Sequence, residues 1–507
     1  MRKRTLLFVS AFAGTLNAQT FLDQTWSSNG VANDTTETAT YHFLDVMRTA
    51  NGVFACGWRE NGPTSRKSVV AAFQDNGSMK PMWGVGGTTA EMEATFLCLA
   101  DQSDGRVLAG GMIYLDDTLR WLIAAFRYDG SLDPSFGDQG LFIWTASIGG
   151  YLQDLAVDSQ DRIVAVGWQL DAALGTTVVR CAADGTLDTD FGNGGVIFAD
   201  APGLQLEQGK GCALGPDGKI GVIAVGTTND ARIHVYAFEL DDEGALNEAF
   251  ADGTGYHVIN ERGSAGDIHY TPDGSLILSG VRAGDLWCEK LTPEGIHVFN
   301  YGYNGQFPGL PNGGYDYYVT GRSILMSDGS LVMTAILHDY LVDEHWMLLV
   351  KISPYGLLDL NFGILGVMFE HAVQVRATTD PDEMPLGCDV DDQSRFYCAG
   401  GTRPDMRAAV FRFVETGTIG VDEHTPTGPL HVFPVPASDL VHVDFPVNSD
   451  VARMLVADAA GAVVFTLNEP AKGGSVLDVR HWASGPYVVT AVDDDGLIVG
   501  RSHFLVR

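Results

Sequence analysis

The chain has 507 residues, 45% of them hydrophobic, and carries a formal net charge of −33. A chain this long cannot fold around one ordinary core, so several domains or a repeat array are expected, and the apolar fraction argues against global disorder. The excess of acidic residues argues against nucleic acid as a partner, because phosphate binding needs a basic surface. We expect most of this charge to form a solvated surface that keeps the protein dispersed.

The first 18 residues have the pattern of a secretory signal peptide. Basic residues at positions 2–4 precede a short apolar run at 6–16, and the bond between Ala18 and Gln19 is the predicted cleavage site. A membrane anchor is the alternative, but the run is far shorter than the span of about 20 residues that a membrane helix needs. No later apolar stretch is long enough either, so the sequence predicts no transmembrane segment.

A short signature that ends in an aromatic residue recurs along the chain. It is clearest at residues 129–140 and 184–195, where an Asp-Gly turn precedes Leu-Asp, the aromatic residue and further glycines. The turn glycine supplies a positive φ, and the Asp side chain can accept hydrogen bonds from its own backbone. The aromatic residues of the seven copies are Trp26, Trp83, Phe136, Phe191, Phe250, Tyr301 and Phe362.

Apolar runs separated by polar turns recur roughly every 55 residues, a period that is typical of propeller blades or repeat arrays. In one unit the runs cover residues 95–99, 107–114, 121–128 and 141–145, and they are rich in β-branched and aromatic residues. Four strands in about 55 residues match one blade of a β-propeller. A parallel β-helix would need much shorter coils, and a helical solenoid would need a 3.6-residue periodicity that the sequence lacks.

Each aromatic residue of the signature is expected to fill the wedge between neighbouring blades. The glycine that follows it would let the backbone pass close to the next sheet. The alternative is a ring of exposed aromatic residues that bind sugars, but an exposed platform would not require the adjacent glycine.

The first copy of the signature, around Trp26, is displaced. No strands precede it, whereas the last repeat ends near Val414 without a tail. We therefore predict an all-β fold with a seven-bladed β-propeller over residues 19–414, in which residues 19–31 supply the closing strand of the last blade. This segment should pair with the strand around residues 408–414 and bury Trp26 in a wedge, because closure removes unpaired sheet edges.

These repeats resemble the delta-60 repeat, a bacterial β-propeller-type repeat whose signature ends in Leu-Asp-x-x-Phe-Gly-x-x-Gly. The resemblance covers about residues 21–414 and is strongest at 129–140 and 184–195. It implies a propeller fold in a bacterial protein. It does not imply a molecular activity, because the activity of the family is itself unclear.

The end of the chain has a different pattern. Residues 415–429 combine Thr, Gly, Pro and acidic residues and indicate a linker. Residues 430–507 contain about seven short apolar runs, which predicts a small β-sandwich. Residues 440–445 alternate as a strand does, and a turn around residue 461 predicts a hairpin.

This last unit resembles the C-terminal sorting domain of type A cargo of the type IX secretion system of Bacteroidota. The matching residues are Pro434, Pro436, Asp458, Gly461, Gly485 and Tyr487. Val435 is a departure, since the family usually has Asn between the two prolines. The resemblance implies handling by the type IX secretion machinery, export through the outer membrane, removal of the domain, and either release or attachment to lipopolysaccharide.

Seven cysteines do not make a disulfide framework in a chain of this size, and most lie in strand patterns as small core residues. Cys388 and Cys398 flank the turn 391–395 symmetrically, so they could face each other across a hairpin and form a disulfide. A surface rich in Ca²⁺ is an alternative use for the acidic residues, but no EF-hand loop occurs. We predict no metal site and no cofactor.

The sequence contains no His-Glu-x-x-His, Gly-x-Ser-x-Gly, Walker or Cys-x-x-Cys motif, so it predicts no catalytic residue. A cluster at 343–345 could bind metal or act as acid and base, although a solvated loop is the simpler interpretation. In a closed ring, loops between the second and third strands would crowd one rim as an acidic funnel, which is the candidate ligand surface. These loops hold Asp116, Asp117, Asp171, Asn229, Asp230, Arg282, Asp285, Arg403 and Asp405.

We interpret the chain as an exported, monomeric β-propeller that binds an extracellular protein or glycan without catalysis. Two alternatives remain, a propeller enzyme that acts on extracellular glycans as a hydrolase or lyase, and a structural or adhesion protein of the cell surface. An enzyme should bring two carboxylates, or a His and a carboxylate, together in a concave channel with shifted pKa values. A binding module should show exposed aromatic residues without such a pair.

Overall fold

The chain divides into two compact units, Met1–Glu415 and Thr416–Arg507. The structure, a computed structural model, consists almost entirely of antiparallel strands, which confirms the predicted all-β class. It describes residues 21–33, 41–60, 66–146, 149–170, 175–282, 285–307, 309–310, 316–339, 344–363, 366–370, 387–402, 407–414, 430–433, 437–445, 451–458, 463–468, 470–471, 473–492 and 498–506.

In its described part, the first unit has six sheets. One sheet holds β2 (Tyr41–Thr49), β3 (Gly52–Glu60) and β4 (Arg66–Phe73). The next two hold β5 (Ala94–Asp101), β6 (Val107–Leu115), β7 (Thr118–Phe126) and β8 (Leu141–Trp144), and then β9 (Leu152–Val157), β10 (Ile163–Gly167), β11 (Thr176–Cys181) and β12 (Val196–Ala199). A six-stranded sheet holds β13 (Gln205–Leu214), β14 (Ile220–Thr227), β15 (Ile233–Leu240), β16 (Tyr256–Tyr270), β17 (Leu276–Arg282) and β18 (Asp285–Leu291). The remaining two hold β19 (Asp316–Leu325), β20 (Leu331–Asp339), β21 (Glu344–Ile352) and β22 (Val367–Glu370), and then β1 (Val31–Asn33), β23 (Cys388–Val390), β24 (Arg395–Thr402) and β25 (Arg407–Val414).

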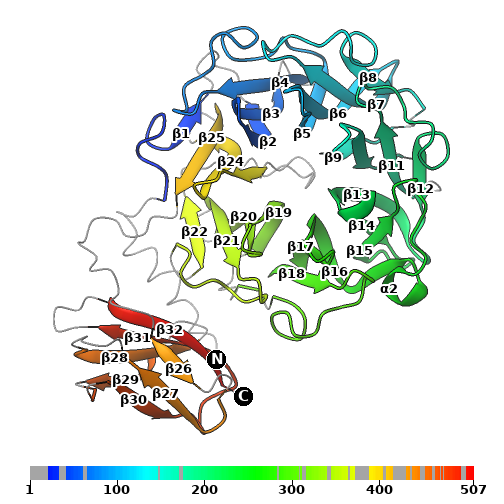
Figure 1. Cartoon of the computed structure of the whole chain (residues 1–507). Helices are drawn as coiled ribbons and strands as arrows, with labels where there is room; N and C mark the ends of the chain where they lie inside the picture. Colours follow the sequence, from blue (N-terminus) through cyan, green and yellow to red (C-terminus); the bar gives the residue numbers. More distant parts are fainter. Residues whose placement is uncertain are drawn as a thin grey trace. The chain divides into compact units, whose positions relative to one another are not determined.

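The sheets of the first unit follow one another in chain order around a common centre, with β9 near the centre and β12 at the periphery of the same sheet (Figure 1). The middle strands β10 and β11 are buried along their whole length, whereas the peripheral β8 is only partly buried. A strand with a packed sheet on both faces needs apolar side chains on both faces. This is why the sequence shows continuous apolar runs there rather than strict alternation.

β16 is unusual because it serves two groups of strands. It spans 15 residues. Val235 of β15 pairs with Ile259 near its beginning, and Leu276 of β17 pairs with Tyr270 at its end. The two short helices, η1 (Pro216–Gly218) and α2 (Phe250–Gly253), are single turns that contain left-handed residues and lie where the repeat has its tight turns.

One contact recurs at the sheet boundaries and is built from the aromatic signature. Phe136, which follows β7, is fully buried, and a Cβ atom at Gly185 of the next sheet would lie 2.7 Å from its ring. Beside it, the backbone N–H of Gly137 donates to the carbonyl of Asp184 over 2.7 Å. The same bond joins Gly84 to Asp129 (2.6 Å), Gly192 to Glu243 (2.7 Å) and Gly302 to Tyr355 (2.6 Å). It also joins Ala251 to Glu294 (2.8 Å), between the two groups of strands in the six-stranded sheet.

The N-terminal segment makes the equivalent contact between the two ends of the first unit. Trp26 is 0% exposed, and a Cβ atom at Gly77 would lie 2.7 Å from its ring. The N–H of Ser27 donates to the carbonyl of Asn76 over 2.9 Å. In the same segment β1 pairs with β25, and Val31 lies opposite Phe411. A strand from the beginning of the unit therefore belongs to the sheet that contains its last strands.

A glycine follows five of the seven aromatic residues, and at Gly302 it lies close to the next sheet, as expected, since a Cβ atom there would lie 2.7 Å from the carbonyl oxygen of Gly356. The glycine also has a second role, because a Cβ atom at Gly137 would lie 2.2 Å from the carbonyl oxygen of Leu141 in its own sheet. Its φ is +49°, in the left-handed region, and this turn points its N–H toward the next sheet. The packing of the aromatic ring itself against the next sheet is made by the turn glycine, as at Gly185.

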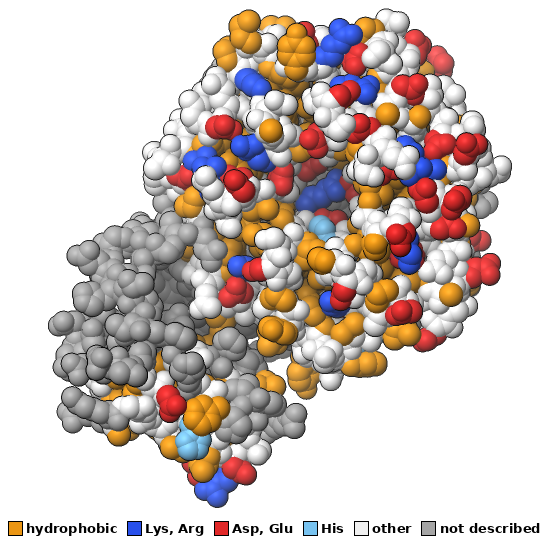
Figure 2. Space-filling model, in the orientation of Figure 1, with side chains coloured by type: hydrophobic (Ala, Val, Ile, Leu, Met, Phe, Trp, Pro, Cys, Tyr) orange, Lys and Arg blue, Asp and Glu red, His pale blue; other side chains and the backbone are white. Residues whose placement is uncertain are grey.

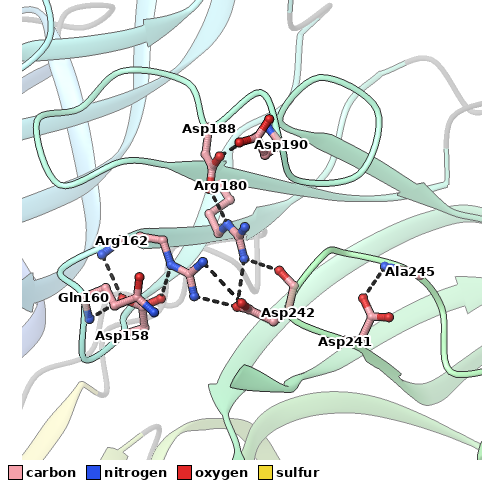
Figure 3. A network of polar contacts seen from close by, with 9 residues as sticks. All are labelled: Asp158, Gln160, Arg162, Arg180, Asp188, Asp190, Asp241, Asp242 and Ala245. Carbon is pink, nitrogen blue, oxygen red and sulfur yellow. Dashed lines mark hydrogen bonds and ion pairs between the residues drawn. The ribbon is translucent and has the colours of Figure 1, made fainter. Parts of the chain in front are cut away.

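Ion pairs reinforce one of these boundaries (Figure 3). Arg180 of β11 lies 2.7 Å from Asp188 in its own sheet and also reaches Asp242, which follows β15. Arg162, just before β10, lies 2.6 Å from Asp158 and 2.5 Å from Asp242. Asp242 thus joins two arginines of the neighbouring sheet.

The second unit has seven strands in its described part, arranged in two sheets. One sheet holds β26 (His431–Phe433), β27 (Leu440–Asp444) and β30 (Gly474–Asp478), and the other β28 (Arg453–Asp458), β29 (Val463–Asn468), β31 (Gly485–Val492) and β32 (Ile498–Val506). Val443 and Leu477 of the first sheet share one buried cluster with Met454, Val489 and Phe504 of the second. In the part of the chain that the structure describes, no helix is long and apolar enough to span a membrane.

Candidate functional site

Charged residues of the innermost strands meet at the centre of the first unit. Asp45 of β2, Asp154 of β9 and Asp267 of β16 each follow an irregularity in strand pairing, at which one residue is skipped. Such a bulge re-aims the next side chain. Arg322 of β19 also lies at a skipped position. We call Asp45, Asp154, Asp267 and Arg322 the central cluster.

The carboxylates of the central cluster tie neighbouring strands together. One oxygen of each accepts from the N–H of the following residue, and the other accepts from the innermost strand of the next group. Asp45 Oδ2 accepts from Leu99 N (2.8 Å), Asp154 Oδ2 from Cys212 N (2.9 Å) and Asp267 Oδ2 from Ser323 N (2.9 Å). Asp389 of β23 similarly accepts from Arg48 N over 2.5 Å. Each side chain therefore serves as a link between strands that are not paired by backbone bonds.

Arg322 reaches two of these carboxylates. Its guanidinium forms an ion pair with Asp154 and lies 3.7 Å from Asp45 Oδ2. The Asp154 side chain is 1% exposed, whereas that of Arg322 is 26% exposed. Figure 2 shows a recess at the middle of the first unit, where basic and histidine side chains lie among acidic ones.

The pKa values follow from this burial and pairing. Burial raises the pKa of Asp45 and Asp154, although the charge of Arg322 opposes the rise. Burial also acts on Asp267, but the neighbouring His269 and Arg322 hold its pKa below the ordinary value. Burial raises the pKa of Asp389 to about 6. Burial is the main reason that Asp45 and Asp154 are hard to ionise, and repulsion between neighbouring carboxylates adds to it.

Asp267, His269 and Ser323 lie together, but not as a catalytic triad. His269 Nε2 is 2.9 Å from Ser323 Oγ and 3.5 Å from Asp267 Oδ2, so one ring nitrogen faces both residues. In a triad the Asp holds one nitrogen of the imidazole while the other accepts the Ser proton. The hydroxyl of Ser323 is buried and also lies 3.1 Å from Ser279 Oγ. These contacts fit a structural hydrogen-bond network.

Among the residues that the structure places, no three His, Cys, Asp or Glu side chains form a group that could hold a metal ion. The carboxylate oxygens of the central cluster already accept backbone N–H groups, which would have to be released before a cation could bind.

The structure describes some of the loop residues that were proposed to form an acidic funnel. Asp116, Asp117, Asn229 and Asp230 are exposed, and Asp116 and Asp117 have a positive φ in the turn between β6 and β7. Asp230 pairs with Arg232, and Arg282 donates to Gln306 over 2.5 Å, so these contacts stay within one sheet. Asp171, Arg403, Asp405, Asp343 and the side chains of Glu344 and His345 lie outside the described part of the chain.

The other predicted residues have mixed outcomes. Cys388 and Cys398 lie opposite each other in β23 and β24, and both are free thiols in this structure. In the second unit Tyr487 is buried and donates to the Ala483 carbonyl over 2.8 Å, while Asp458 and Gly485 lie at the ends of β28 and β31. Ala18, Gln19, Pro434, Pro436 and Gly461 lie outside the described residues.

Sequence reasoning missed the central cluster. Its only sequence signal is an acidic residue inside an apolar run, as in Leu44-Asp45-Val46 and Gln153-Asp154-Leu155. Buried acidic side chains are rare unless they are paired, so these positions call for a partner. The partner Arg322 is 168 residues away from Asp154 in the chain (322 minus 154), and no local pattern identifies it.

Two family models match parts of the chain. The model described as "Secretion system C-terminal sorting domain" matches residues 431–502. The model described as "Domain of unknown function (DUF5122) beta-propeller" matches residues 102–136, which contain β6, β7 and the signature at 129–140 as far as Phe136. Among curated proteins, none matches the chain.

Several solved structures resemble the chain at low sequence identity. A protein of unknown function from Dyadobacter fermentans is 11% identical with a TM-score of 0.37, over 76% of this chain and 99% of that one. A protein from Lactobacillus plantarum is 14% identical with a TM-score of 0.41, over 87% and 99%. An ulvan lyase of polysaccharide lyase family PL25 is 7% identical with a TM-score of 0.39, over 63% and 84%.

The two family matches agree with the two units of the fold. The sorting domain of the type IX secretion system directs export through the outer membrane, to the cell surface or the surroundings. The chain is therefore an exported protein with a β-propeller-type domain and a C-terminal sorting domain of the type IX secretion system.

Proposed function

We propose that residues 19–414 form a seven-bladed propeller in which the six-stranded sheet contributes two blades, divided within β16. The support is the recurrence of the boundary contact, including the copy made by Trp26 and Ser27. The N-terminal strand β1 would then close the last blade beside β25. Such closure couples the two ends of the array and removes unpaired edges.

We further propose that this propeller is a non-enzymatic binding module for an extracellular protein or glycan. One observation carries the proposal: Phe299, Tyr303 and Tyr355 are 75%, 71% and 76% exposed at a single sheet boundary. The N–H of Gly302, next to Tyr303, donates to the carbonyl of Tyr355, so the two segments are in direct contact. We call these three residues the aromatic boundary.

Exposed aromatic residues here contrast with the equivalent positions elsewhere. At the boundary between the β9–β12 sheet and β13–β15, the corresponding residues are Thr189, Asn193 and Glu243. The scaffold is the same in both places, so folding does not require aromatic side chains at the surface. Large exposed aromatic groups on a rigid frame are typical of binding sites, where they contribute much of the interaction free energy.

A propeller enzyme is the second candidate, since carboxylates and a histidine do meet at the ring centre. Asp45, Asp154 and Asp267 are buried, however, and their oxygens accept backbone N–H groups. A general base must reach the proton that it removes. The central cluster is therefore better explained as a structural link, which leaves the surface as the place for ligands.

The test is a glycan array and a pull-down from the surrounding medium, both with the exported protein. Replacing the aromatic boundary by Phe299→Ala, Tyr303→Ala and Tyr355→Ala should weaken binding at least about tenfold, or about 1.4 kcal/mol. The matched control is Thr189→Ala, Asn193→Ala and Glu243→Ala, which should bind as the wild type does. Equal binding by both triple variants would refute this site. Turnover of a glycan by the wild type would favour the enzyme.

We also propose that the mature protein extends from Gln19 to about residue 425, after removal of the signal peptide and the sorting domain. The match at residues 431–502 supports this proposal. Intact mass spectrometry of the exported protein tests both ends. Retention of the second unit in the exported form would contradict the expected processing.

A further inference from the structure

Cys388 and Cys398 occupy a particular kind of cross-strand position. They lie directly opposite each other in the antiparallel pair of β23 and β24. The adjacent pair, Gly387 and Ala399, is joined by a hydrogen bond from Ala399 N to Gly387 O of 2.9 Å. Hydrogen-bonded and non-hydrogen-bonded pairs alternate along an antiparallel ladder, so the cysteines occupy a non-hydrogen-bonded pair. Side chains approach each other most closely at such pairs.

We propose that the exported protein contains a disulfide between Cys388 and Cys398. The Cα atoms of a non-hydrogen-bonded pair are about 4.5 Å apart, which lies within the range that disulfides span. Export removes the chain from the reducing cytosol, and thiols persist as disulfides in such compartments. In the reaction, the two thiols form one S–S bond while an external disulfide of a thiol oxidoreductase takes up two electrons and two protons to become two thiols.

None of the other five cysteines faces a cysteine across its described strand pairs. Cys56 lies opposite Asp45, Cys98 opposite Gly110 and Cys181 opposite Ile163. Cys212 lies opposite Val222, and Cys288 lies opposite Ser279. The pairing register therefore selects one pair out of seven cysteines.

The surroundings indicate when the bond must form. Both thiols belong to a buried cluster that includes Phe362, Phe396 and Phe411, and the Cys388 thiol donates to the carbonyl of Arg322 over 3.5 Å. Burial raises the pKa of both thiols, and the thiolate is the reactive form. The bond should therefore form while the β23–β24 hairpin is still accessible during folding, and reduction of the folded protein should be slow.

The bond would fasten the sheet in which the two ends of the first unit meet. β23 carries Asp389, whose Oδ2 accepts from Arg48 N in β2. β24 pairs with β25, which in turn pairs with β1. A covalent link between β23 and β24 would thus hold the inner edge of this sheet against its centre.

Peptide mapping of the exported protein tests the proposal. The protein is denatured without reductant, its free thiols are alkylated, and trypsin is added. Trypsin cleaves after Arg395, between the two cysteines, so the disulfide would keep the peptides of Cys388 and Cys398 together until reductant is added. We expect the other five cysteines to be alkylated. Alkylation of all seven cysteines, or a link between any other pair, would overturn the proposal.

A stability measurement provides a second test. Reductant should lower the urea midpoint of the wild type and of the control variant Cys212→Ala. It should leave the midpoint of the double variant Cys388→Ala, Cys398→Ala unchanged. If reductant shifts the wild type no more than the double variant, no disulfide contributes to the folded state.

Discussion

The sheet boundaries and the ring centre hold the first unit together in different ways. At the boundaries one contact is repeated, in which an aromatic ring packs on a turn glycine and a backbone N–H crosses to the next sheet, as for Phe136 and Gly185. At the centre the innermost strands contribute different residues. Asp45, Asp154 and Asp267 link neighbouring strands, and Arg322 reaches across to two of them.

The comparison shows which interactions a repeated sequence can encode. Packing between neighbours recurs because the units present similar surfaces to one another, so one signature serves the six places where the bond is seen among the described residues. The centre is different, because all the inner strands face one small volume that holds a limited number of charges. The same aspartate contact recurs on four inner strands, at Asp45, Asp154, Asp267 and Asp389, whereas β19 contributes the positively charged Arg322.

The largest expected effect tests whether the N-terminal copy of the boundary contact contributes as much to the free energy of unfolding as an internal copy does. Trp26→Ala removes a fully buried ring that makes an edge-to-face contact with Tyr397 and lies 5.1 Å from the Arg412 guanidinium. We expect the free energy of unfolding to fall by about 3–5 kcal/mol, as for other buried aromatic residues. Urea unfolding followed by fluorescence measures it.

The internal counterpart Phe136→Ala is the control for this measurement and should cost a similar amount. A Trp26 variant that loses less than about 1 kcal/mol would show that the N-terminal segment is dispensable, and would separate its contact from the repeated one.

The next effect tests the ring centre. Arg322→Met leaves Asp45 and Asp154 buried without their counter-ion. Loss of one partner of a buried pair costs about 3–5 kcal/mol, and we expect about 3 because Arg322 is partly exposed. The exposed pair Arg232 and Asp230 supplies the control, since Arg232→Met should cost less than about 1 kcal/mol.

The loss of unfolding free energy in the Arg322→Met variant should also depend on pH. Arg322 opposes the rise that burial causes in the pKa of Asp45 and Asp154, so its removal should raise both pKa values further. A group whose folded pKa is raised stabilises the folded state as the pH falls, so acidification should stabilise the variant more than the wild type. The difference in unfolding free energy between the variant and the wild type should therefore become smaller as the pH falls from 7 toward 5. A gap that widens would contradict the role assigned to Arg322.

A smaller effect separates two reasons for glycine in the signature, namely the left-handed backbone conformation and the lack of space for a Cβ atom. Gly137 and Gly194 both have a positive φ, of +49° and +64°. A Cβ atom at Gly137 would lie 2.2 Å from Leu141 O, whereas a Cβ atom at Gly194 would have no neighbour within 4 Å. Gly194→Ala should cost about 1 kcal/mol, for the left-handed conformation alone. Gly137→Ala should cost clearly more, and equal thermal midpoints for the two variants would show that the close approach is relieved without cost.

The smallest effect concerns a place where the repeat itself changes. His297 stands where four other copies have Leu132, Leu187, Leu246 and Leu358, and its Nδ1 lies 3.5 Å from the buried Glu289. Glu289, which also lies 2.8 Å from His257, raises the pKa of His297 above its ordinary value of 6.5. The stabilisation by this pair is complete below pH 6.5 and is lost as the pH rises through the folded pKa.

Stability should therefore decrease by less than about 1 kcal/mol as the pH rises above 6.5. His297→Leu restores the residue of the other copies and should reduce this dependence, as urea midpoints between pH 6 and 8 would show. An unchanged pH profile in the variant would assign the dependence to Asp389, whose pKa burial raises to about 6.

Much of the local structure could be predicted from the sequence. The four strands expected between residues 95 and 145 are β5, β6, β7 and β8, and the hairpin expected near residue 461 is formed by β28 and β29. These elements depend on side-chain periodicity and turn residues, which act over a few positions. The type IX sorting domain was recognisable for the same reason, since its motifs are short and local.

The tertiary structure decided what depends on distant residues. The sequence contains Asp154 and Arg322, but only the arrangement of inner strands around one centre brings them together. In the same way Ser323 looks unremarkable in the sequence, and its contact with His269 becomes interpretable only when one ring nitrogen is seen to face both Ser323 and Asp267. Sequence alone determined the strands, the turns and the export signal, because local conformational preference and periodicity encode them. The fold decided which charges share the centre, because the energy of a buried charge depends on partners that the chain brings near only when it folds.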